Sequence, residues 1–255
     1  MPQTKLDPIR PKIQHFLRQD GIGDPLKRLQ DLLPAECDLF ILGGALRNII
    51  AEHFHGRAPR TQDVDIFVGN LETDFDLQGC FKEKNCTVTE LGGVRWQPNH
   101  STFSFDLCPL DRFFNIEKHQ LAPTLENLLA GTDFSVNAVV WNIKSESLTE
   151  RQAVDAIQRK TIDFNTDRFL TRNLLLYRVL VMRHKLDFIL SRQVYNFVKQ
   201  QTDSDALYTL KNSLHSKLGK TTAQTILKDY DRINGYQDYP EYVTSEWKRI
   251  HGAGS

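Results

Sequence analysis

The chain of 255 residues is 40% hydrophobic and 25% charged, which is typical of a globular protein with a sizeable core. Its 32 lysines and arginines equal its 32 aspartates and glutamates, so the net charge does not indicate a nucleic-acid partner. Any surface that binds nucleic acid would have to be a local basic patch. No apolar run could cross a bilayer, the N-terminus lacks the apolar stretch of a signal peptide, and the four cysteines show no CxxC spacing. These features argue against a membrane partner, a disulfide scaffold and a zinc knuckle, and predict a cytoplasmic protein.

The N-terminal part of the chain, residues 1–34, predicts short helices interrupted by a Gly-Ile-Gly-Asp-Pro sequence. A short apolar run at 39–42 then ends in Gly43 and Gly44, which is typical of a buried strand followed by a tight turn. Apolar residues at helical spacing follow in 45–53. The sequence therefore predicts a strand, a glycine turn and a helix.

Two clearer strand patterns follow, at 63–68 and 102–108. Alternation in the first places Asp63 and Asp65 on the face opposite its valine and isoleucine side chains. Alternation in the second places Asp106 on the face opposite its aromatic side chains. Two weaker strand patterns complete the predicted sheet, at 87–90 and 138–141.

The remainder of the chain, from residue 155 onward, has a helical pattern, with helices predicted at 169–186, 194–198, 207–218 and 222–233. A polar stretch without apolar periodicity, 145–151, separates it from the strands. We therefore expect an α/β (α+β) fold, in which a mixed sheet flanked by helices precedes an all-helical lobe. The expected parts are an N-terminal helical segment at 1–34, the mixed-sheet domain at 35–148, the helical lobe at 149–251 and a flexible tail at 252–255.

Asp63 and Asp65 lie two residues apart on one predicted strand, which brings their carboxylates together on the same face. Such like charges repel, and a hard divalent cation, Mg²⁺ or Mn²⁺, relieves the repulsion while leaving coordination sites open for phosphate and water. Asp106 supplies a third ligand if its strand is a neighbour. Three carboxylates around two metal ions can activate an attacking oxygen and stabilise a leaving pyrophosphate. A bare Asp-x-Asp pair is more often just exposed, so the residues before it decide its meaning.

Gly43 and Gly44 end a predicted strand and open a predicted helix. Glycines there let backbone N–H groups approach an anion at the positive helix end, which suits a nucleoside triphosphate. A lone Gly-Gly pair is more simply explained as a structural turn. The order strand, glycine turn, helix, basic loop with Arg57 and Arg60, and then Asp63 is much rarer. It indicates phosphate binding beside metal binding.

Motifs in this order resemble the head and neck regions of the bacterial CCA-adding enzymes and poly(A) polymerases, in the polymerase-β-like nucleotidyltransferase superfamily. The resemblance runs from about residue 39 to 190. It is carried by Leu42-Gly43-Gly44-Ala45-Leu46-Arg47-Asn48, Asp63-Val64-Asp65-Ile66-Phe67-Val68, Phe105-Asp106-Leu107-Cys108-Pro109-Leu110, Asp133-Phe134-Ser135-Val136-Asn137-Ala138, the link at 155–162 and the helix at 178–188.

This resemblance implies a nucleotidyltransferase that moves a nucleoside monophosphate from an NTP, ATP or CTP, to an RNA 3′ end, with a tRNA 3′ end as the specific form. It implies that Asp63, Asp65 and Asp106 are catalytic and hold Mg²⁺ or Mn²⁺. The implied nucleotide-binding residues are Gly43, Gly44, Arg47, Asp133, Asn137, Arg172 and Arg178. For the two arginines on the predicted helix, a solvated helix face is an equally good explanation.

The sequence departs from the family pattern in several places. A glycine and a threonine replace the family's Arg-Arg before the nucleotide motif, the base-reading Glu-Asp-x-x-Arg motif is missing, and an asparagine replaces an acid. The positions concerned are Gly131 and Thr132, then Thr171, Arg172 and Leu175, and finally Asn48. The chain is also too short for the separate body and tail that hold a whole tRNA in the family.

Two other hypotheses stay open. The missing base-reading motif and tail favour transfer of the nucleotide to a protein or a small molecule, as in toxin-like or resistance-type relatives. A non-catalytic nucleotide- or RNA-binding module is the third possibility, and the three carboxylates argue against it because without a cation they destabilise the fold. The nucleotide used and the oligomeric state are not defined by the sequence.

Overall fold

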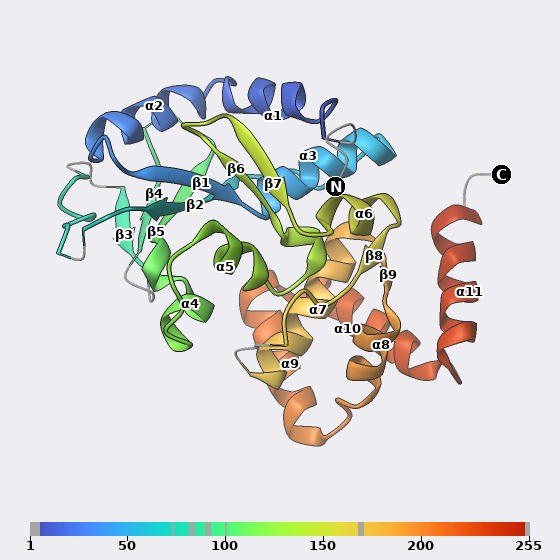
Figure 1. The fold of residues 1–255 in the computed structure, drawn as a ribbon. Coiled ribbons are helices and arrows are strands. Elements are labelled where there is room, and N and C mark those ends of the chain that lie inside the picture. The colour runs from blue at the N-terminus through green and yellow to red at the C-terminus, as the bar shows by residue number, and fades with distance from the viewer. Residues whose placement is uncertain are drawn as a thin grey trace. The chain divides into compact units, whose positions relative to one another are not determined.

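The computed structural model describes residues 6–72, 74–81, 85–89, 93–99, 101–167 and 171–252. The chain forms two compact units (Figure 1). Unit 1 comprises residues 1–132 and 136–154, and unit 2 comprises residues 133–135 and 155–255. The N-terminal helices, α1 (Arg10–Leu17) and α2 (Gly23–Leu32), therefore belong to the same unit as the sheet.

Unit 1 is built on a mixed sheet, which in the described part of the chain has seven strands in the order β3-β4-β5-β2-β1-β6-β7. β2 and β5 are parallel, and the other neighbouring pairs are antiparallel. The three stronger strand patterns of the sequence form β1, β2 and β5, and the two weaker ones form β3 and β6. The strands are β1 (Asp38–Leu42), β2 (Asp63–Gly69), β3 (Cys86–Val88), β4 (Val94–Trp96), β5 (Ser104–Pro109), β6 (Val139–Asn142) and β7 (Ser147–Glu150).

One face of this sheet is apolar. Ile41 of β1 and Val64 and Ile66 of β2 are fully buried, and strand alternation points them to the same side. The helix α3 (Gly44–His55) contacts β1, β2 and β6 and buries Leu46 and Ile50. This packing fixes α3 directly after β1 and holds the first strand of the predicted motif in place.

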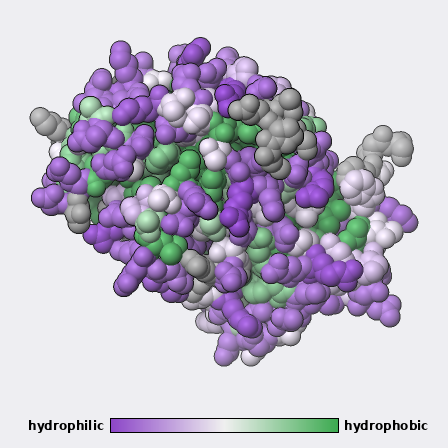
Figure 2. Space-filling view, in the orientation of Figure 1, coloured by the Kyte–Doolittle hydropathy of each residue, from purple (hydrophilic) through white to green (hydrophobic). Residues whose placement is uncertain are grey.

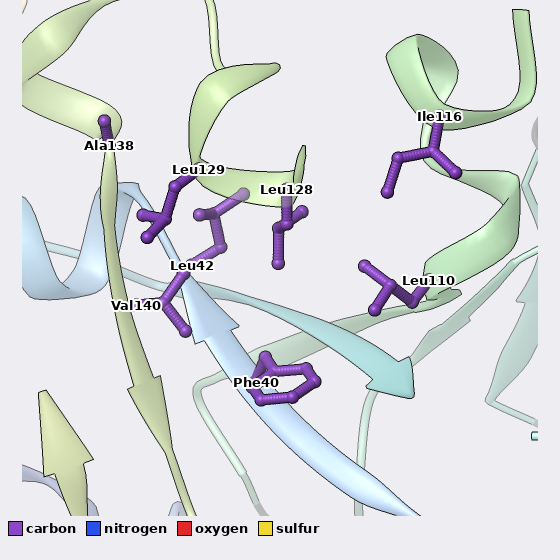
Figure 3. Close-up of a cluster of buried hydrophobic side chains, with 8 residues drawn as sticks. All are labelled: Phe40, Leu42, Leu110, Ile116, Leu128, Leu129, Ala138 and Val140. Carbon is purple, nitrogen blue, oxygen red and sulfur yellow. The ribbon is translucent and has the colours of Figure 1, made fainter. Parts of the chain in front are cut away.

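The opposite face of the sheet carries a second apolar cluster. In Figure 3, Leu42 of β1 lies beside Leu128 and Leu129 of the short helix α5 (Leu125–Ala130). Burying each such side chain stabilises the fold by roughly 1.5–3 kcal/mol. The cluster attaches α5 and α4 (Phe114–Lys118) to the sheet, and consists of Phe40, Leu42, Leu110, Ile116, Leu128, Leu129, Ala138 and Val140.

Unit 2 is mainly helical, as the sequence predicts. The longest predicted helix is α7 (Arg172–Leu186), which begins after the cap Thr171 and is followed by the left-handed C-cap residue Asp187. Helix α6 (Ala153–Gln158) leads the chain from unit 1 into unit 2. The other helices of this unit are α8 (Arg192–Lys199), α9 (Ser204–Leu218), α10 (Lys220–Gly235) and α11 (Tyr239–His251).

The three residues 133–135 belong to unit 2 although the chain on both sides of them belongs to unit 1. Phe134 is fully buried and its ring stacks on Phe164, with the ring centroids 6.1 Å apart. The backbone N–H of Ser135 donates to the carbonyl of Asp163 at 2.9 Å, and the N–H of Asn165 donates to the carbonyl of Asp133 at 3.0 Å. This short segment is therefore held in unit 2 by an antiparallel bridge and an aromatic pair.

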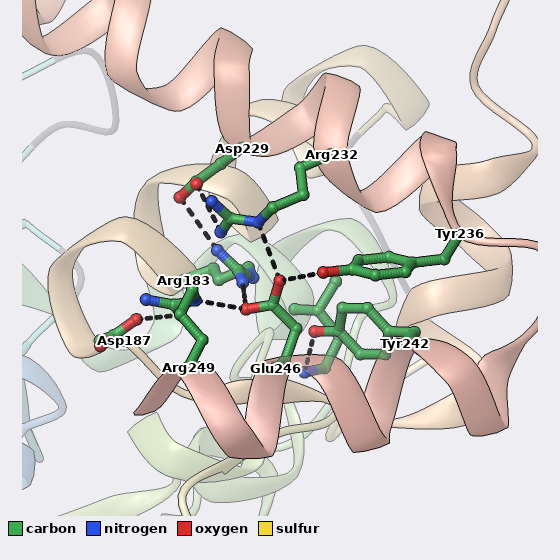
Figure 4. A network of polar contacts seen from close by, with 9 residues as sticks. Arg183, Asp187, Asp229, Arg232, Tyr236, Tyr242, Glu246 and Arg249 are labelled. Carbon is green, nitrogen blue, oxygen red and sulfur yellow. Dashed lines mark hydrogen bonds and ion pairs between the residues drawn. The ribbon is translucent and has the colours of Figure 1, made fainter. Parts of the chain in front are cut away.

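A buried polar network joins three helices of unit 2 (Figure 4). The carboxylate of Glu246, on α11, is fully buried and accepts hydrogen bonds from Arg183 of α7 at 2.5 Å and from Arg232 of α10 at 2.9 Å. Arg249 and the hydroxyl of Tyr236 donate to the same carboxylate, at 2.7 and 2.9 Å. Because each buried charge has several partners, the network can hold α11 against α7 and α10.

The structure corrects two sequence predictions. The polar stretch at 145–151, predicted as a separating segment, contains β7, an edge strand with only Leu148 buried, and the boundary expected after residue 148 falls inside it. Unit 2 is not entirely helical, because β8 (Thr161–Ile162) pairs in parallel with β9 (Ile189–Leu190). Helix α11 lies in the region predicted to be helical, but its bounds were not predicted, since its buried contacts come largely from polar and aromatic side chains.

Some predicted segments extend beyond the described residues. These are the start of the helix expected at 169–186, residue 90 of the strand expected at 87–90, the first five residues of the N-terminal segment, and residues 253–255 of the expected tail. In the view of Figure 2, hydrophilic residues cover most of the surface, with hydrophobic residues in smaller patches between them. None of the helices, as far as the chain is described, is both long and apolar enough to cross a membrane.

Candidate active site

The parallel pair β2 and β5 brings the three predicted acids together on one face of the sheet. Asp65 of β2 is the direct register partner of Asp106 of β5, and Asp63 is the partner of Ser104. Directly paired residues of neighbouring strands point to the same face, so the three carboxylates share one face. Asp63 is exposed, and Asp65 and Asp106 are partly buried. The strand of Asp106 is therefore a direct neighbour of the strand that carries Asp63 and Asp65, which is what a third carboxylate ligand at this site requires.

Two residues that the sequence analysis did not select contact these acids. The hydroxyl of Ser104 donates to Oδ1 of Asp63 at 2.5 Å. Arg95 of β4 forms a two-pronged ion pair with Asp106, with Nε 2.7 Å from Oδ1 and Nη2 2.6 Å from Oδ2. The alternation Val94-Arg95-Trp96, with Arg95 exposed between two buried residues, was the available sequence signal, but the pairing of β4 with β5 could not be read from it.

The carboxylates do not form a closed three-ligand cluster. Among the residues that the structure describes, no three His, Cys, Asp or Glu side chains are grouped closely enough to hold a metal ion. Both carboxylate oxygens of Asp106 are engaged by Arg95 instead. The donor set nevertheless fits a hard cation, because Asp63, Asp65 and Asp106 provide three carboxylates on one partly exposed sheet face.

The glycine turn lies between β1 and α3. Gly43 has φ 76° and ψ −114°, a left-handed conformation that favours glycine, and it forms the N-terminal cap of α3. Its N–H donates to the carbonyl of Val139 at 3.1 Å, and its carbonyl accepts from the N–H of Arg47 at 2.8 Å. The N–H of Gly43 is therefore used inside the fold, so an anion at this helix end would have to be bound by Gly44 and the residues after it.

Arg47 and Asn137, both expected at the nucleotide, contact each other in unit 1. The Arg47 side chain is buried and donates from Nη1 to Oδ1 of Asn137 at 2.7 Å and from Nε to Oδ1 of Asn48 at 3.0 Å. Asn48, in turn, donates to the hydroxyl of Thr61 at 2.7 Å and to the carbonyl of Pro59 at 3.0 Å. The asparagine that replaces the family acid thus fixes the loop that leads to β2.

The other nucleotide-binding candidates belong to unit 2. Asp133 forms an ion pair with Arg178 of α7, with Nη2 2.5 Å from Oδ2, and its Oδ1 accepts from the N–H of Phe134 at 2.9 Å. Arg172 is exposed at the first residue of α7. Four of the seven candidates thus form two pairs, Arg47 with Asn137 and Asp133 with Arg178, and Arg172 is exposed.

The positions that depart from the family pattern have structural roles in this chain. Thr171 caps α7 by accepting from the N–H of Leu174, and Leu175 is buried in the core of unit 2. Thr132 is buried, and its hydroxyl donates to the carbonyl of Leu129 at 3.0 Å. Gly131 is enclosed so closely that a Cβ there would lie 2.6 Å from the ring of Phe113. Thr132, Thr171 and Leu175 thus contribute to packing and helix capping, and Gly131 fits a position with little room for a Cβ.

Cys108 lies two residues after Asp106 on β5. Burial, followed by the charges of Asp111 and Glu117, raises the pKa of its thiol to about 12. The thiol therefore stays protonated at neutral pH, which argues against a role as a nucleophile.

Comparison with known proteins identifies the fold. No family profile and no curated protein sequence matches the chain. The chain has the fold of the CCA-adding enzymes. A CCA-adding enzyme in its apo form I aligns with a TM-score of 0.58 and 15% identity, over 85% of this chain and 52% of that one. The Thermotoga maritima CCA-adding enzyme complexed with tRNA aligns with a TM-score of 0.58 and 14% identity, over 85% of this chain and 52% of that one.

A third solved structure, of a CCA-adding enzyme with ATP, has a TM-score of 0.58 and 15% identity, over 91% of this chain and 54% of that one. The chain thus spans about half the length of these enzymes. The shared fold confirms the mixed sheet followed by a helical part, and the low identity limits what the likeness shows to the fold.

Proposed function

We propose that this chain is a metal-dependent nucleotidyltransferase that transfers a nucleoside monophosphate from an NTP to an RNA 3′ end, with a tRNA 3′ end favoured. The observation that carries the proposal is the register of β2 and β5, which places Asp63, Asp65 and Asp106 on one face beside the glycine turn before α3. The fold shared with CCA-adding enzymes, solved with CTP, ATP and tRNA, supports this class of reaction. The four free thiols of the chain support a reducing, cytoplasmic setting.

The proposal assigns a role to each part of the site. Asp63, Asp65 and Asp106 would hold Mg²⁺ or Mn²⁺, which when bound neutralises phosphate charge and lowers the pKa of a bound hydroxyl. The helix end at Gly44 is assigned to the outer phosphates. Asp133 and Asn137 are assigned to the ribose and phosphates, with Arg47 holding the Asn137 amide in place. In unit 2, Arg172 and Arg178 are assigned to the nucleotide or the RNA.

The reaction is a phosphoryl substitution. The acceptor hydroxyl loses its proton, its oxygen forms a bond to the α-phosphorus, and the bond from that phosphorus to pyrophosphate breaks. In this proposal Asp63 and Asp65 hold both metal ions, and Asp106, their neighbour on β5, helps to hold the ion on the acceptor side.

A second acceptor class has structural support. Leu175 is buried and Thr171 caps α7, so the positions that read the base in the resembled family are occupied by residues of the fold. This favours a different use of the nucleotide, including transfer to a protein or a small molecule. The labelling assay described next distinguishes RNA from protein and small-molecule acceptors.

The purified chain, incubated with each labelled NTP, Mg²⁺ or Mn²⁺ and, in separate reactions, total cellular RNA or a cell extract that contains proteins and small molecules, is expected to label RNA on a denaturing gel. Asp63→Ala should abolish the label and leave the circular dichroism spectrum unchanged, since Asp63 is exposed. Asp31→Ala removes an equally exposed acid from α2 and should leave transfer intact.

The pattern of labelling decides between the acceptors. Label on a protein or a small molecule that is lost in Asp63→Ala keeps the transferase and changes its acceptor. Full activity in Asp63→Ala contradicts the catalytic assignment. No label on any acceptor with any NTP leaves a nucleotide- or RNA-binding module as the function.

A further inference from the structure

Arg95 ends a row of charged side chains that crosses three neighbouring strands. The register pairs Asp65 of β2 with Asp106 of β5, and Asp106 with Arg95 of β4. Since directly paired residues point to one face, the two acids and the arginine lie next to one another, with Asp63 two residues earlier on β2. The carboxylate face is therefore bordered by a built-in cation.

The contact is a two-pronged one. Nε and Nη2 of Arg95 lie 2.7 and 2.6 Å from the two oxygens of Asp106, the geometry in which a guanidinium binds a carboxylate most strongly. The Arg95 side chain is nevertheless 55% exposed, against 24% for Asp106. The guanidinium is thus held mainly by its partner and not by burial, and it can move into solvent once the pair is broken.

The electrostatic surroundings of Arg95 include all three acids. The hydrogen bond and the charge of Asp106 raise the pKa of Arg95 above its ordinary value, and the charges of Asp63 and Asp65 add to this. One guanidinium therefore offsets repulsion that the three carboxylates would otherwise exert on each other.

We propose that Arg95 is the counter-ion of the carboxylate face in the metal-free protein, and that it competes with the divalent ion for Asp106. This inference rests on the proposed function, because it concerns the same site. An arginine fork and a divalent cation both use the oxygens of the carboxylate, so an ion that takes Asp106 as a ligand displaces the guanidinium at least in part.

The test is the affinity of the full chain for Mn²⁺, measured by titration calorimetry without nucleotide or RNA. The variants are Arg95→Ala and Arg95→Lys. The control is Arg112→Ala, which breaks the exposed ion pair between Arg112 and Glu117 of unit 1, 2.9 Å long. Asp106→Ala and the double variant Arg95→Ala/Asp106→Ala show how much of any change in Mn²⁺ affinity depends on Asp106. Circular dichroism checks that each variant is folded.

Arg95→Ala is expected to bind Mn²⁺ about two- to fivefold more tightly than the wild type, the range set by the strength of an exposed ion pair. Arg95→Lys restores a charge and should return the affinity toward the wild-type value, and Arg112→Ala should not change it. In the Asp106→Ala background the gain should disappear. Without metal, Arg95→Ala should unfold at a lower temperature, and saturating Mn²⁺ should remove that difference.

Equal or weaker Mn²⁺ binding by Arg95→Ala overturns the competition and shows that Arg95 at most orients Asp106 as a ligand, while the metal-dependent function stands. A gain that persists in the Asp106→Ala background also overturns it. If neither the wild type nor Arg95→Ala binds Mn²⁺ above the level of Asp63→Ala, the metal-dependent function itself fails, and the competition fails with it.

Discussion

Gly131 is a residue whose small size the fold requires. Its backbone is not in the left-handed region, so conformational freedom is not the reason for glycine. A Cβ at this position would lie 2.6 Å from the Phe113 ring and 3.0 Å from both Asn115 Cβ and the Asn127 carbonyl. The amide of Asn115 also donates to the Gly131 carbonyl at 2.6 Å. A side chain such as the arginine of the resembled family would require Phe113, Asn115 or the backbone at Asn127 to shift.

Gly131→Ala should therefore destabilise unit 1 by about 1–3 kcal/mol, the usual cost of overpacking. Thermal or urea unfolding followed by circular dichroism measures the change. Gly235→Ala is the matched control, because no atom lies within 4 Å of a Cβ there. Unchanged stability in Gly131→Ala would show that Phe113 and Asn115 move aside at no cost.

At the scale of elements, α11 is attached to unit 2 mainly by polar groups. Glu246 lies at the centre of the network in Figure 4, and Tyr242 accepts a hydrogen bond from the N–H of Leu190 at 2.9 Å. The hydroxyl of Tyr239 donates to the carbonyl of the same residue at 3.2 Å. The helix is thus joined to β9 by its tyrosines and to α7 and α10 by its glutamate.

Glu246→Gln keeps the shape of the side chain and removes its charge. Arg183, 1% exposed, then keeps only Asp229, at 2.9 Å, as an anionic partner, so we expect a cost of about 3 kcal/mol, at the lower end of the range for breaking a buried pair. Unfolding should occur at a clearly lower urea concentration than for the control Asp231→Asn, which removes an exposed charge from α10. If the two variants unfold alike, the network does not stabilise α11.

At the scale of the whole molecule, the sequence predicted those elements whose residues carry a periodic pattern. β2 and β5 follow from alternation and α3 from helical spacing, whereas β1 follows from an apolar run that ends at the glycine turn. β8 and β9 have two residues each, which is too short for any period, and β7 is polar because it is an edge strand with one buried side chain. The apolar pattern therefore could not reveal them.

The candidate site was predictable only in part, for a related reason. The spacing of Asp63 and Asp65 is local and shows in the sequence, whereas the contact of Arg95 with Asp106 depends on which strands pair. Arg95 and Asp106 are 11 residues apart in the chain. Which strands pair over such a separation is decided by packing, and no single residue in the sequence reveals it. The mutual contact of Arg47 and Asn137, 90 residues apart, was hidden in the same way.

Acid should weaken unit 2 through Glu246. Burial alone would raise the pKa of this carboxyl, but the charge of Arg183 and the hydrogen bonds from Arg249 and Tyr236 lower it below its ordinary value. A carboxylate with a lowered pKa in the folded state stabilises the fold above its unfolded pKa, about 4.3, and this contribution is lost as the pH falls further.

The midpoint of thermal unfolding of the wild type should therefore drop as the pH is lowered from about 5 to about 3. Glu246→Gln, which has no such group to protonate, should show a shallower drop. Scanning calorimetry over this pH range measures both. Parallel curves for the two proteins would contradict the assignment of the acid sensitivity to Glu246.

The segment 133–135 has a consequence for how the gene can be divided. The chain enters unit 2 for these three residues, returns to unit 1 for 136–154 and then enters unit 2 again. A fragment that begins at residue 155 would leave the ring of Phe164 without its stacked partner Phe134, and Arg178 without Asp133. No single cut therefore yields two intact halves, and a recombination event within 136–154 would pass on a helical part that lacks a piece of its own core.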